Sequence, residues 1–163
     1  MITSSILKEI PFFQSFTLGE IDTLMKDSEM VADYSRGDYI IVQGSDQTQD
    51  LFILVRGEVE ITDAMHHHIT YLSTGSIFGE ISFITHQPRM TNVVALGDVI
   101  VVRIDKKSVD RIDLKLQLKI KDSLIETLIS RIGEMNRMMV DKDQSNLVLV
   151  KALRSMGQNP VLD

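Results

Sequence analysis

The sequence predicts an α+β domain in which an antiparallel β-barrel or β-roll is flanked by helices. Three observations lead to this fold class. Short runs rich in β-branched and aromatic residues recur between residues 39 and 104. Glycines punctuate these runs at close intervals, as is typical of antiparallel barrels and rolls. Apolar residues at helical spacing appear both before and after this region.

The segment before the β-rich region predicts a helix over residues 17–27. Thr17 can cap its N-terminus, and apolar residues from Leu18 to Met25 recur at helical spacing. The predicted strands follow, and Val59 and Ile61 alternate with polar residues in one of them, so that strand should have one solvent-facing side. The strand ranges are 39–43, 51–55, 58–62, 69–72, 91–96 and 99–104, with Gly44, Gly57, Gly75 and Gly97 at or beside the breaks.

Helical spacing returns from Lys106 onward. It predicts a short helix over 108–114 and a longer helix over 115–140. The longer helix carries one apolar stripe, formed by Leu124, Leu128, Ile132, Met135 and Met139. Two interpretations of this stripe stay open: it packs on the β-region of its own chain, or part of it meets a second copy in a homodimer.

Composition restricts the class of protein. The chain has 163 residues, a net charge of −6 and no cysteine. Its length fits one domain with a real core. Without cysteine, disulfides, thiol catalysis and thiolate metal sites are excluded. The acidic balance argues against nucleic acid, although Lys115, Lys119 and Lys121 form a dense cationic group. We expect no nucleic-acid binding by this chain alone.

Apolar runs are short throughout the sequence. None approaches the ~20 residues that a membrane span requires. The N-terminus also lacks the apolar stretch of a signal peptide. We therefore expect a cytoplasmic protein without a membrane span.

The most informative segment is Phe78 to Val94, which contains Gly79-Glu80-Ile81-Ser82 and Pro88-Arg89. Glycine lets the backbone bend and approach a ligand closely. The first turn of a following helix leaves N–H groups without intrahelical partners, and such a turn favours a phosphate. Arg89 supplies positive charge in a planar fork that grips two phosphate oxygens. This pattern predicts a site for a phosphate ester.

Glu80 requires a different role, because a carboxylate repels a phosphate. An ionised carboxylate only accepts hydrogen bonds, and a ribose 2′-hydroxyl can donate one. Dinucleotide-binding folds use an acidic residue on the ribose in this way. Glu80 and Arg89 are therefore interpreted as a pair that binds ribose and phosphate.

This segment resembles the phosphate-binding cassette of the cyclic nucleotide-binding domain family. The family includes regulatory subunits of cAMP-dependent kinases, bacterial catabolite activator proteins and cyclic nucleotide-gated channels. By this resemblance, Glu80 takes the ribose hydroxyl and Arg89 the cyclic phosphate, and the backbone amides of Ile81, Ser82 and Met90 add donors. The implied ligand-binding set is Phe78, Gly79, Glu80, Ile81, Ser82, Arg89, Met90 and Thr91.

The resemblance covers roughly Phe12 to Val140. It implies a jelly-roll-like, double-stranded β-helix type of roll over about 30–105, with N-terminal helices before it and C-terminal helices after it. We expect a cyclic nucleotide-binding domain over 1–140 and a short helical tail over 141–163, as in a stand-alone member of bacterial type. The tail offers one more helix, Ser145–Met156, before Gly157 and Asn159-Pro160. Catabolite activators continue with a helix-turn-helix domain, for which this tail is too short.

The resemblance favours cAMP over cGMP as the ligand. Members selective for cGMP often carry threonine directly after the cassette arginine, where this chain has Met90, with Thr91 one residue later. Ile61, Ile69 and Thr70 are implied wall residues for the base. The expected function is a sensor module whose C-terminal helices respond to binding and act on an unknown effector protein.

Two alternatives compete with the sensor. One is an interaction or scaffold domain of the same fold that responds to no nucleotide. The other is a cupin-like metalloenzyme using His66-His67-His68, but the next acid, Glu80, lies too far along for the cupin spacing, and an exposed hairpin loop explains these histidines. No spacing marks a nucleophilic triad. We therefore expect a non-enzyme that holds no metal.

Overall fold

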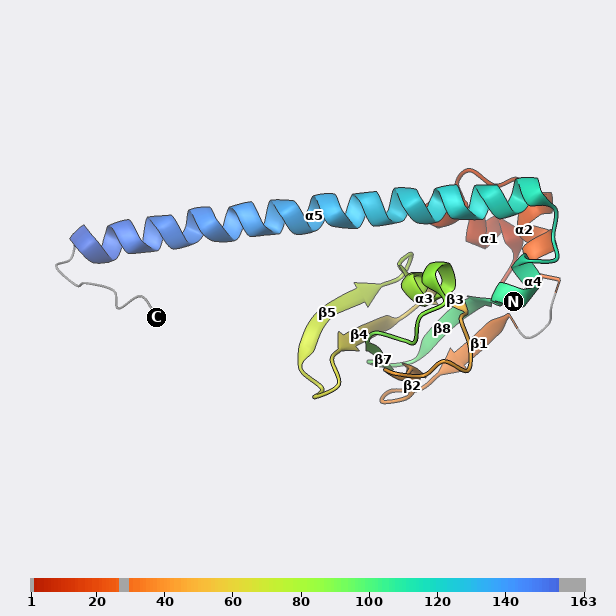
Figure 1. Ribbon diagram of the computed structural model, residues 1–163, viewed down its shortest axis with the longest axis horizontal. Coiled ribbons are helices and arrows are strands. Elements are labelled where there is room, and N and C mark those ends of the chain that lie inside the picture. Colours follow the sequence, from red (N-terminus) through yellow and green to blue (C-terminus); the bar gives the residue numbers. More distant parts are fainter. Residues whose placement is uncertain (1, 27–29, 156–163) are drawn as a thin grey trace. The chain divides into compact units, whose positions relative to one another are not determined.

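The computed structural model describes residues 2–26 and 30–155, and it contains two compact units, Met1–Leu124 and Ile125–Asp163. Figure 1 shows the β-region of the first unit with its helices and the long helix α5. The helices are α1 (Ser4–Lys8), the 3₁₀ turn η1 (Pro11–Phe13), α2 (Leu18–Leu24), α3 (Glu80–Thr85), α4 (Lys106–Val109) and α5 (Leu114–Ser155). The strands are β1 (Val31–Tyr34), β2 (Tyr39–Ile41), β3 (Leu51–Arg56), β4 (Glu58–Thr62), β5 (His68–Ser73), β6 (Ile77–Phe78), β7 (Asn92–Ala95) and β8 (Val99–Ile104).

The strands form two antiparallel four-stranded sheets. Their orders are β1-β8-β3-β6 and β2-β7-β4-β5. The chain passes between the sheets at most connections, as in a jelly-roll-like β-roll. Helices precede and follow the roll along the chain. The predicted fold class, an antiparallel roll flanked by helices, is confirmed.

Two apolar clusters fill the first unit. One lies inside the roll, where Leu54, Val59 and Val101 have no exposed surface. The other joins a sheet to the helices on either side of the roll in sequence, and it includes Phe13 of η1 and Ile120 of α5. The first turns of α5 are therefore part of the domain core.

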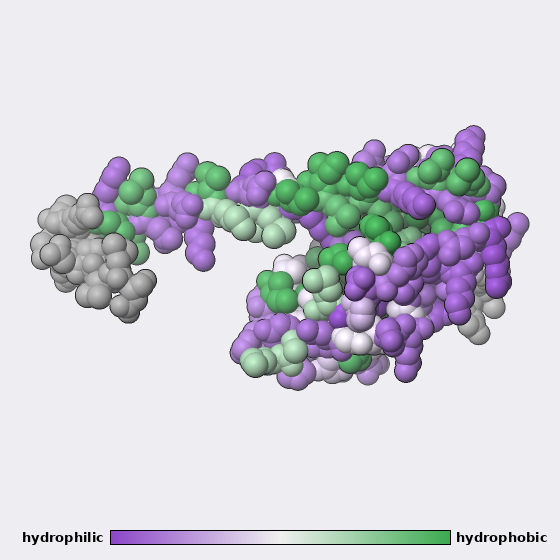
Figure 2. Space-filling view, in the orientation of Figure 1, coloured by the Kyte–Doolittle hydropathy of each residue, from purple (hydrophilic) through white to green (hydrophobic). Residues whose placement is uncertain are grey.

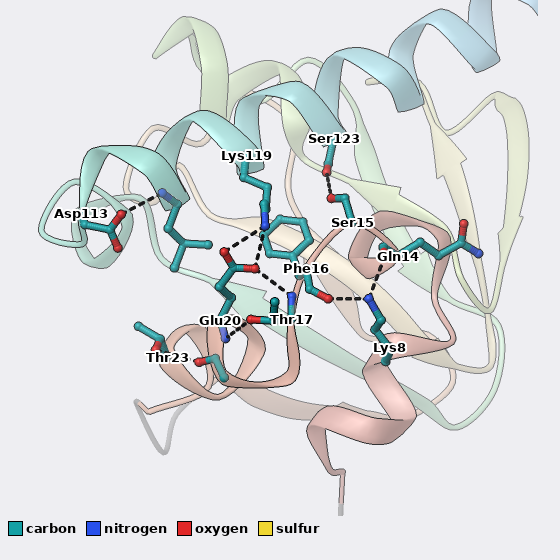
Figure 3. A network of polar contacts seen from close by, with 12 residues as sticks. Lys8, Gln14, Ser15, Phe16, Thr17, Glu20, Thr23, Asp113, Lys119 and Ser123 are labelled. Carbon is teal, nitrogen blue, oxygen red and sulfur yellow. Dashed lines mark hydrogen bonds and ion pairs between the residues drawn. The ribbon is translucent and has the colours of Figure 1, made fainter.

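Polar contacts reinforce the attachment of α5 to the N-terminal helices (Figure 3). Lys119 Nζ donates to both carboxylate oxygens of Glu20, at 2.7 and 2.9 Å, and lies 5.6 Å from the ring centroid of Phe16. Glu20 also closes a capping box with Thr17, the predicted helix cap. The hydrogen bond from Lys119 and that from the Thr17 backbone lower the pKa of Glu20.

The strand predictions are largely confirmed, with differences at the ends. The predicted strands 58–62 and 99–104 match β4 and β8, and the other four overlap β2, β3, β5 and β7. The sequence missed β1 and the two-residue β6. Both are short and lie at sheet edges, where pairing with β8 and β3 rather than local composition makes them strands.

The C-terminal helices differ from prediction. The predicted helix 108–114 is wrong: Asp105 caps α4, which begins at Lys106 and ends at Val109. The predicted break between 140 and Ser145 is also wrong, because α5 runs without interruption to Ser155. No glycine or proline lies between 134 and 155 to end the helix. The predicted stop at Gly157 and Asn159-Pro160 lies outside the described residues.

Across residues 2–26 and 30–155, no helix combines the length and the apolar character that crossing a bilayer requires.

Candidate functional site

Gly79 lies between β6 and α3 in a left-handed conformation that favours glycine. Its φ is +78°. A Cβ there would come within 2.7 Å of Arg89 Nη1 and 2.9 Å of the Asp50 carbonyl oxygen. The missing side chain thus provides the space in which the guanidinium meets the backbone.

Arg89 is buried, with 5% of its surface exposed. Its Nη1 donates to the Gly79 carbonyl at 3.0 Å, and its Nη2 donates to the Asp50 carbonyl at 2.8 Å. The guanidinium carbon lies 5.7 Å from the ring centroid of Phe52. Burial lowers the pKa of Arg89, while the charges of Asp50 and Glu80 oppose that shift. A cation is therefore held in the fold by neutral carbonyl oxygens and nearby acids.

The backbone of Arg89 is also fixed. Its N–H donates to the Ser45 carbonyl at 2.9 Å, and its carbonyl accepts from the Gly44 N–H at 2.8 Å. These bonds attach the segment after Pro88 to the loop between β2 and β3. The orientation of Arg89 is thus set by segments about forty residues apart in sequence.

Glu80 begins α3 directly beside Gly79. It is 6% exposed, and its charge acts on Arg89. Ser82, 2% exposed, lies in the same helical turn. The structure therefore brings Gly79, Glu80 and Arg89 together, and it places Ser82, another residue of the predicted set, on the buried side of α3.

The remaining residues of the predicted set occupy different environments. Phe78 is buried and stacks on Phe52, with ring centroids 5.3 Å apart. Thr91 is half-buried. Ile81 and Met90 are 43% and 61% exposed. The roles predicted for Ile81 and Met90 concern their backbone amides, so they stay predictions.

Sequence reasoning missed Asp50 and Asn92. Asp50 supplies a carbonyl to Arg89 from a position just before β3. Asn92 accepts from the Gln43 N–H at 2.8 Å and donates to the Asp63 carbonyl at 2.9 Å, which ties the start of β7 to two loops. The signal for Asp50 was an acid directly before an apolar strand. Its carbonyl contact could not be read from sequence, because backbone groups look the same at every position.

The histidines have separate partners. His86 ends α3, and its Nδ1 lies 2.6 Å from Gln49 Oε1. In the hairpin between β4 and β5, His67 contacts Asp63 and His68 contacts Glu60, at 3.0 and 2.9 Å. Within residues 2–26 and 30–155, no group of three or more His, Cys, Asp or Glu side chains is arranged to hold a metal ion.

The two-sheet roll, with helix α3 and the buried Arg89 beside it, defines the structural class of this protein. The sequence model of the cyclic nucleotide-binding domain family matches residues 31–113, about half of the chain, from β1 to the loop before α5. The chain belongs to this family.

Curated relatives share the same region. The chain is 29% identical over 112 residues to a cAMP-dependent protein kinase regulatory subunit of Blastocladiella emersonii. The aligned region covers 66% of this chain and 27% of the relative. It is 35% identical over 81 residues to human cGMP-dependent protein kinase 2. That aligned region covers 46% of this chain and 10% of the kinase. The chain thus spans about a quarter or less of these relatives.

Solved structures share the fold. A crystal structure of a Geobacter metallireducens GS-15 protein, described as a candidate cyclic nucleotide-binding protein, matches with a TM-score of 0.70 at 22% identity, over 81% of this chain and 99% of that chain. The regulatory subunit of a cAMP-independent protein kinase A from Trypanosoma brucei matches with a TM-score of 0.65 at 23% identity, over 76% and 43%.

Proposed function

We propose that this chain is a regulatory module that binds a cyclic nucleotide, with cAMP preferred over cGMP. The observation that carries the proposal is the buried Arg89, whose hydrogen bonds from Nη1 and Nη2 go to carbonyl oxygens. The related regulatory subunits named for cAMP dependence support the same ligand. The module is a binding protein rather than an enzyme, and it acts in the cytoplasm.

The phosphate is assigned to Arg89. Burying a cation is costly unless an anion or a set of dipoles compensates it. Nη1 and Nη2 each carry two hydrogens, and the bonds to Gly79 and Asp50 use one on each. The remaining hydrogens suit a bidentate contact with two phosphate oxygens. A cyclic monophosphate carries one negative charge, which would compensate the buried guanidinium.

The ribose is assigned to Glu80. Its carboxyl is buried beside Gly79 and influences Arg89 electrostatically. If a ribose hydroxyl donates a hydrogen bond to Glu80, the negative charge of the Glu80 carboxylate faces the sugar and not the phosphate. Backbone amides of Ile81, Ser82 and Met90 complete the proposed donor set.

The base is assigned to the inner side of β4 and β5. Ile61 is 9% exposed and pairs across the ladder with Thr70. The preference for cAMP rests on Met90, which stands where a threonine would meet a guanine amino group. Because human cGMP-dependent protein kinase 2 is among the relatives, both nucleotides belong in the test.

Titration calorimetry with cAMP and cGMP tests the site. We expect wild type to bind cAMP more tightly than cGMP. Arg89→Leu should weaken binding about tenfold to more than a hundredfold, because one charged pair contributes about 1.5–3 kcal/mol. Arg89→Lys keeps the charge without the fork and should fall between them. The exposed Arg36 provides a matched control, and Arg36→Leu should bind like wild type. Equal affinity in all four proteins would remove Arg89 from the site.

A second candidate function is a scaffold domain that responds to no nucleotide. It is favoured by the shared fold of a regulatory subunit from a cAMP-independent kinase. Thermal unfolding with increasing cAMP separates the two. A true ligand raises the melting temperature with concentration by mass action, and a scaffold domain shows no shift.

Binding is proposed to change the C-terminal helices and a surface that an effector protein reads. Such a response requires that the ligand bind two conformations with different affinity. The first turns of α5 belong to the core of the first unit, so a rearrangement there must also move residues such as Ile120.

A homodimer through the 115–140 helix is proposed as a further partnership. Ile125, Leu128, Ile132, Met135 and Met139 follow one another at intervals of 3, 4, 3 and 4 residues, which is the spacing of a coiled-coil seam. Figure 2 shows hydrophobic side chains recurring along α5. Four of these five residues are more than half exposed, and Leu128 is half-buried.

A further inference from the structure

The ends of β3 and β8 meet beside the candidate site. Leu51 pairs with Ile104 across the ladder, so the next residues outward, Asp50 and Asp105, face each other. Asp50 is 4% exposed, and its carbonyl oxygen accepts the 2.8 Å bond from Arg89 Nη2. Asp50 thus contacts the arginine through its backbone while its side chain lies at the end of two paired strands.

The Asp50 carboxyl interacts with two residues of the opposite strand end. Its Oδ2 lies 3.6 Å from Nε of Arg103, and its carboxyl neighbours that of Asp105 across the ends of the two paired strands. Burial raises the pKa of Asp50, Arg103 opposes that shift, and Asp105 adds to it. The charge of Asp50 also contributes to the raised pKa of Tyr34 on β1, after the larger effect of burial. The Asp50 carboxyl is therefore a buried acid at the point where the ends of β3 and β8 meet.

Asp105 in turn holds the start of α4. Its Oδ1 accepts from the Lys107 N–H at 3.2 Å, and its Oδ2 accepts from the N–H and hydroxyl of Ser108, both at 3.0 Å. These bonds outweigh burial and lower the pKa of Asp105. Asp105 is therefore both the cap of α4 and the partner of Asp50.

Stability alone does not explain this cluster. Burying an acid next to a second acid is costly, and one partially exposed arginine at 3.6 Å offsets only part of that cost. An apolar residue at position 50 could supply the same carbonyl to Arg89. The acidic side chain adds two things that an apolar residue could not supply: a negative charge near Arg89, and contacts with Arg103 and Asp105 at the end of β8.

We propose that Asp50, Arg103 and Asp105 form a joint that couples the hold on Arg89 to the capping of α4. Asp50 acts as a positioning residue on both sides, through its carbonyl on Arg89 and through its carboxyl on Asp105. The consequence for ligand rests on the proposed function: a phosphate that redirects the guanidinium changes the free energy of the α4 cap. Coupling is reciprocal, so the state of the cap also changes nucleotide affinity.

A ligand-free double-mutant cycle tests the joint. Unfolding equilibria are measured by urea denaturation for Arg89→Leu, Asp105→Ala and the double variant. We expect the double variant to depart from additivity by a factor of about three or more in the unfolding constant. Thr3 caps α1 through the Ile6 N–H at 3.4 Å and serves as the control. The cycle of Arg89→Leu with Thr3→Ala should be additive within about twofold.

A second variant keeps the test informative if Asp105→Ala fails to fold. Asp105→Asn keeps a good helix cap but removes the carboxylate that faces Asp50. The same cycle with Asp105→Asn should again be non-additive. Additivity within the range of the Thr3 control, in the cycles that fold, would overturn the joint.

The ligand consequence is measured separately by calorimetry with cAMP. Asp105→Asn should change the Kd for cAMP by about threefold or more, because the two sites share one coupling free energy. Thr3→Ala should leave the Kd within about twofold. An unchanged Kd in Asp105→Asn would overturn the coupling of the joint to nucleotide. If wild type binds no cAMP, the proposed function fails, and the ligand-free cycle still decides whether the joint exists.

Discussion

At the scale of single residues, the site depends on where backbone atoms lie. Gly79 and Asp50 contribute carbonyl oxygens to Arg89, and Gly44 and Ser45 hold its backbone. The sequence pattern identified Gly79 and Arg89, because a glycine step and a Pro-Arg step are visible as residue types. It could not identify which carbonyls surround the guanidinium.

Gly79→Ala should destabilise the protein by about 2–4 kcal/mol. A left-handed conformation costs an L-residue about 1–2 kcal/mol, and the new methyl would also crowd Arg89 Nη1 and the Asp50 carbonyl. Gly44 has almost the same φ, +79°, with nothing within 4 Å of an added Cβ. Gly44→Ala should therefore cost only about 1–2 kcal/mol in urea denaturation. Equal losses in the two variants would show that the space beside Gly79 is not restrictive.

Asp50→Asn should stabilise the protein in a pH-dependent way. Burial raises the pKa of Asp50 in the native state. Between the ordinary carboxyl pKa and this raised pKa, the native state therefore binds more protons than the unfolded state. Wild-type stability from this group is present at low pH and is lost as pH rises through the raised pKa. The gain from Asp50→Asn should grow with pH across that window and then level off. Urea denaturation of both proteins between about pH 3 and pH 8 measures this gain in the free energy of unfolding. A gain that stays constant over this range would contradict the prediction.

At the scale of elements, α5 has two different environments. Leu116, Ile120 and Leu124 are buried in the core of the first unit. From Ile125 onward the apolar residues of the stripe are exposed or half-buried. Leu124 is buried in the cluster that joins a sheet to the helices, so this residue packs within its own chain, while packing of the stripe on the β-region stays a prediction. The second interpretation, contact with another copy, stays a prediction for the residues that follow.

Ile120→Ala should destabilise the first unit by about 2–5 kcal/mol, because it leaves a cavity in a closed core. Leu114 lies on the same helix with 66% of its surface exposed, and Leu114→Ala should cost less than about 0.5 kcal/mol. Chemical denaturation measures both. Comparable losses would show that the first turns of α5 are not packed as described.

At the scale of the whole molecule, the chain comprises two compact units whose boundary is at Leu124 and Ile125. The family match ends at residue 113, before α5 begins. A binding domain over 1–140 with a tail over 141–163 stays a prediction, but residues 141–155 continue the helix of the preceding residues. An exposed helix with a repeating apolar seam gains stability by pairing with another helix.

Sedimentation at about micromolar to hundred-micromolar concentrations tests the homodimer. Wild type should associate with increasing concentration, and Ile132→Glu should stay monomeric because it places a charge in the seam. Ser130→Glu adds the same charge outside the seam on an exposed position and should associate like wild type. A wild-type protein that remains monomeric over the whole range would contradict the homodimer.

The sequence by itself determined the kind of fold and predicted the principal residues of the candidate site. Strands such as β4 and β8 follow from alternating or continuous β-branched runs, and Gly79, Glu80 and Arg89 follow from residue types that suit phosphate and ribose. Only the tertiary structure decided that β1 and β6 are strands, that Asp50 holds Arg89, and that Asp105 faces Asp50. The reason is physical: strand pairing and carbonyl contacts join segments far apart in the chain, and local sequence carries no record of the partner.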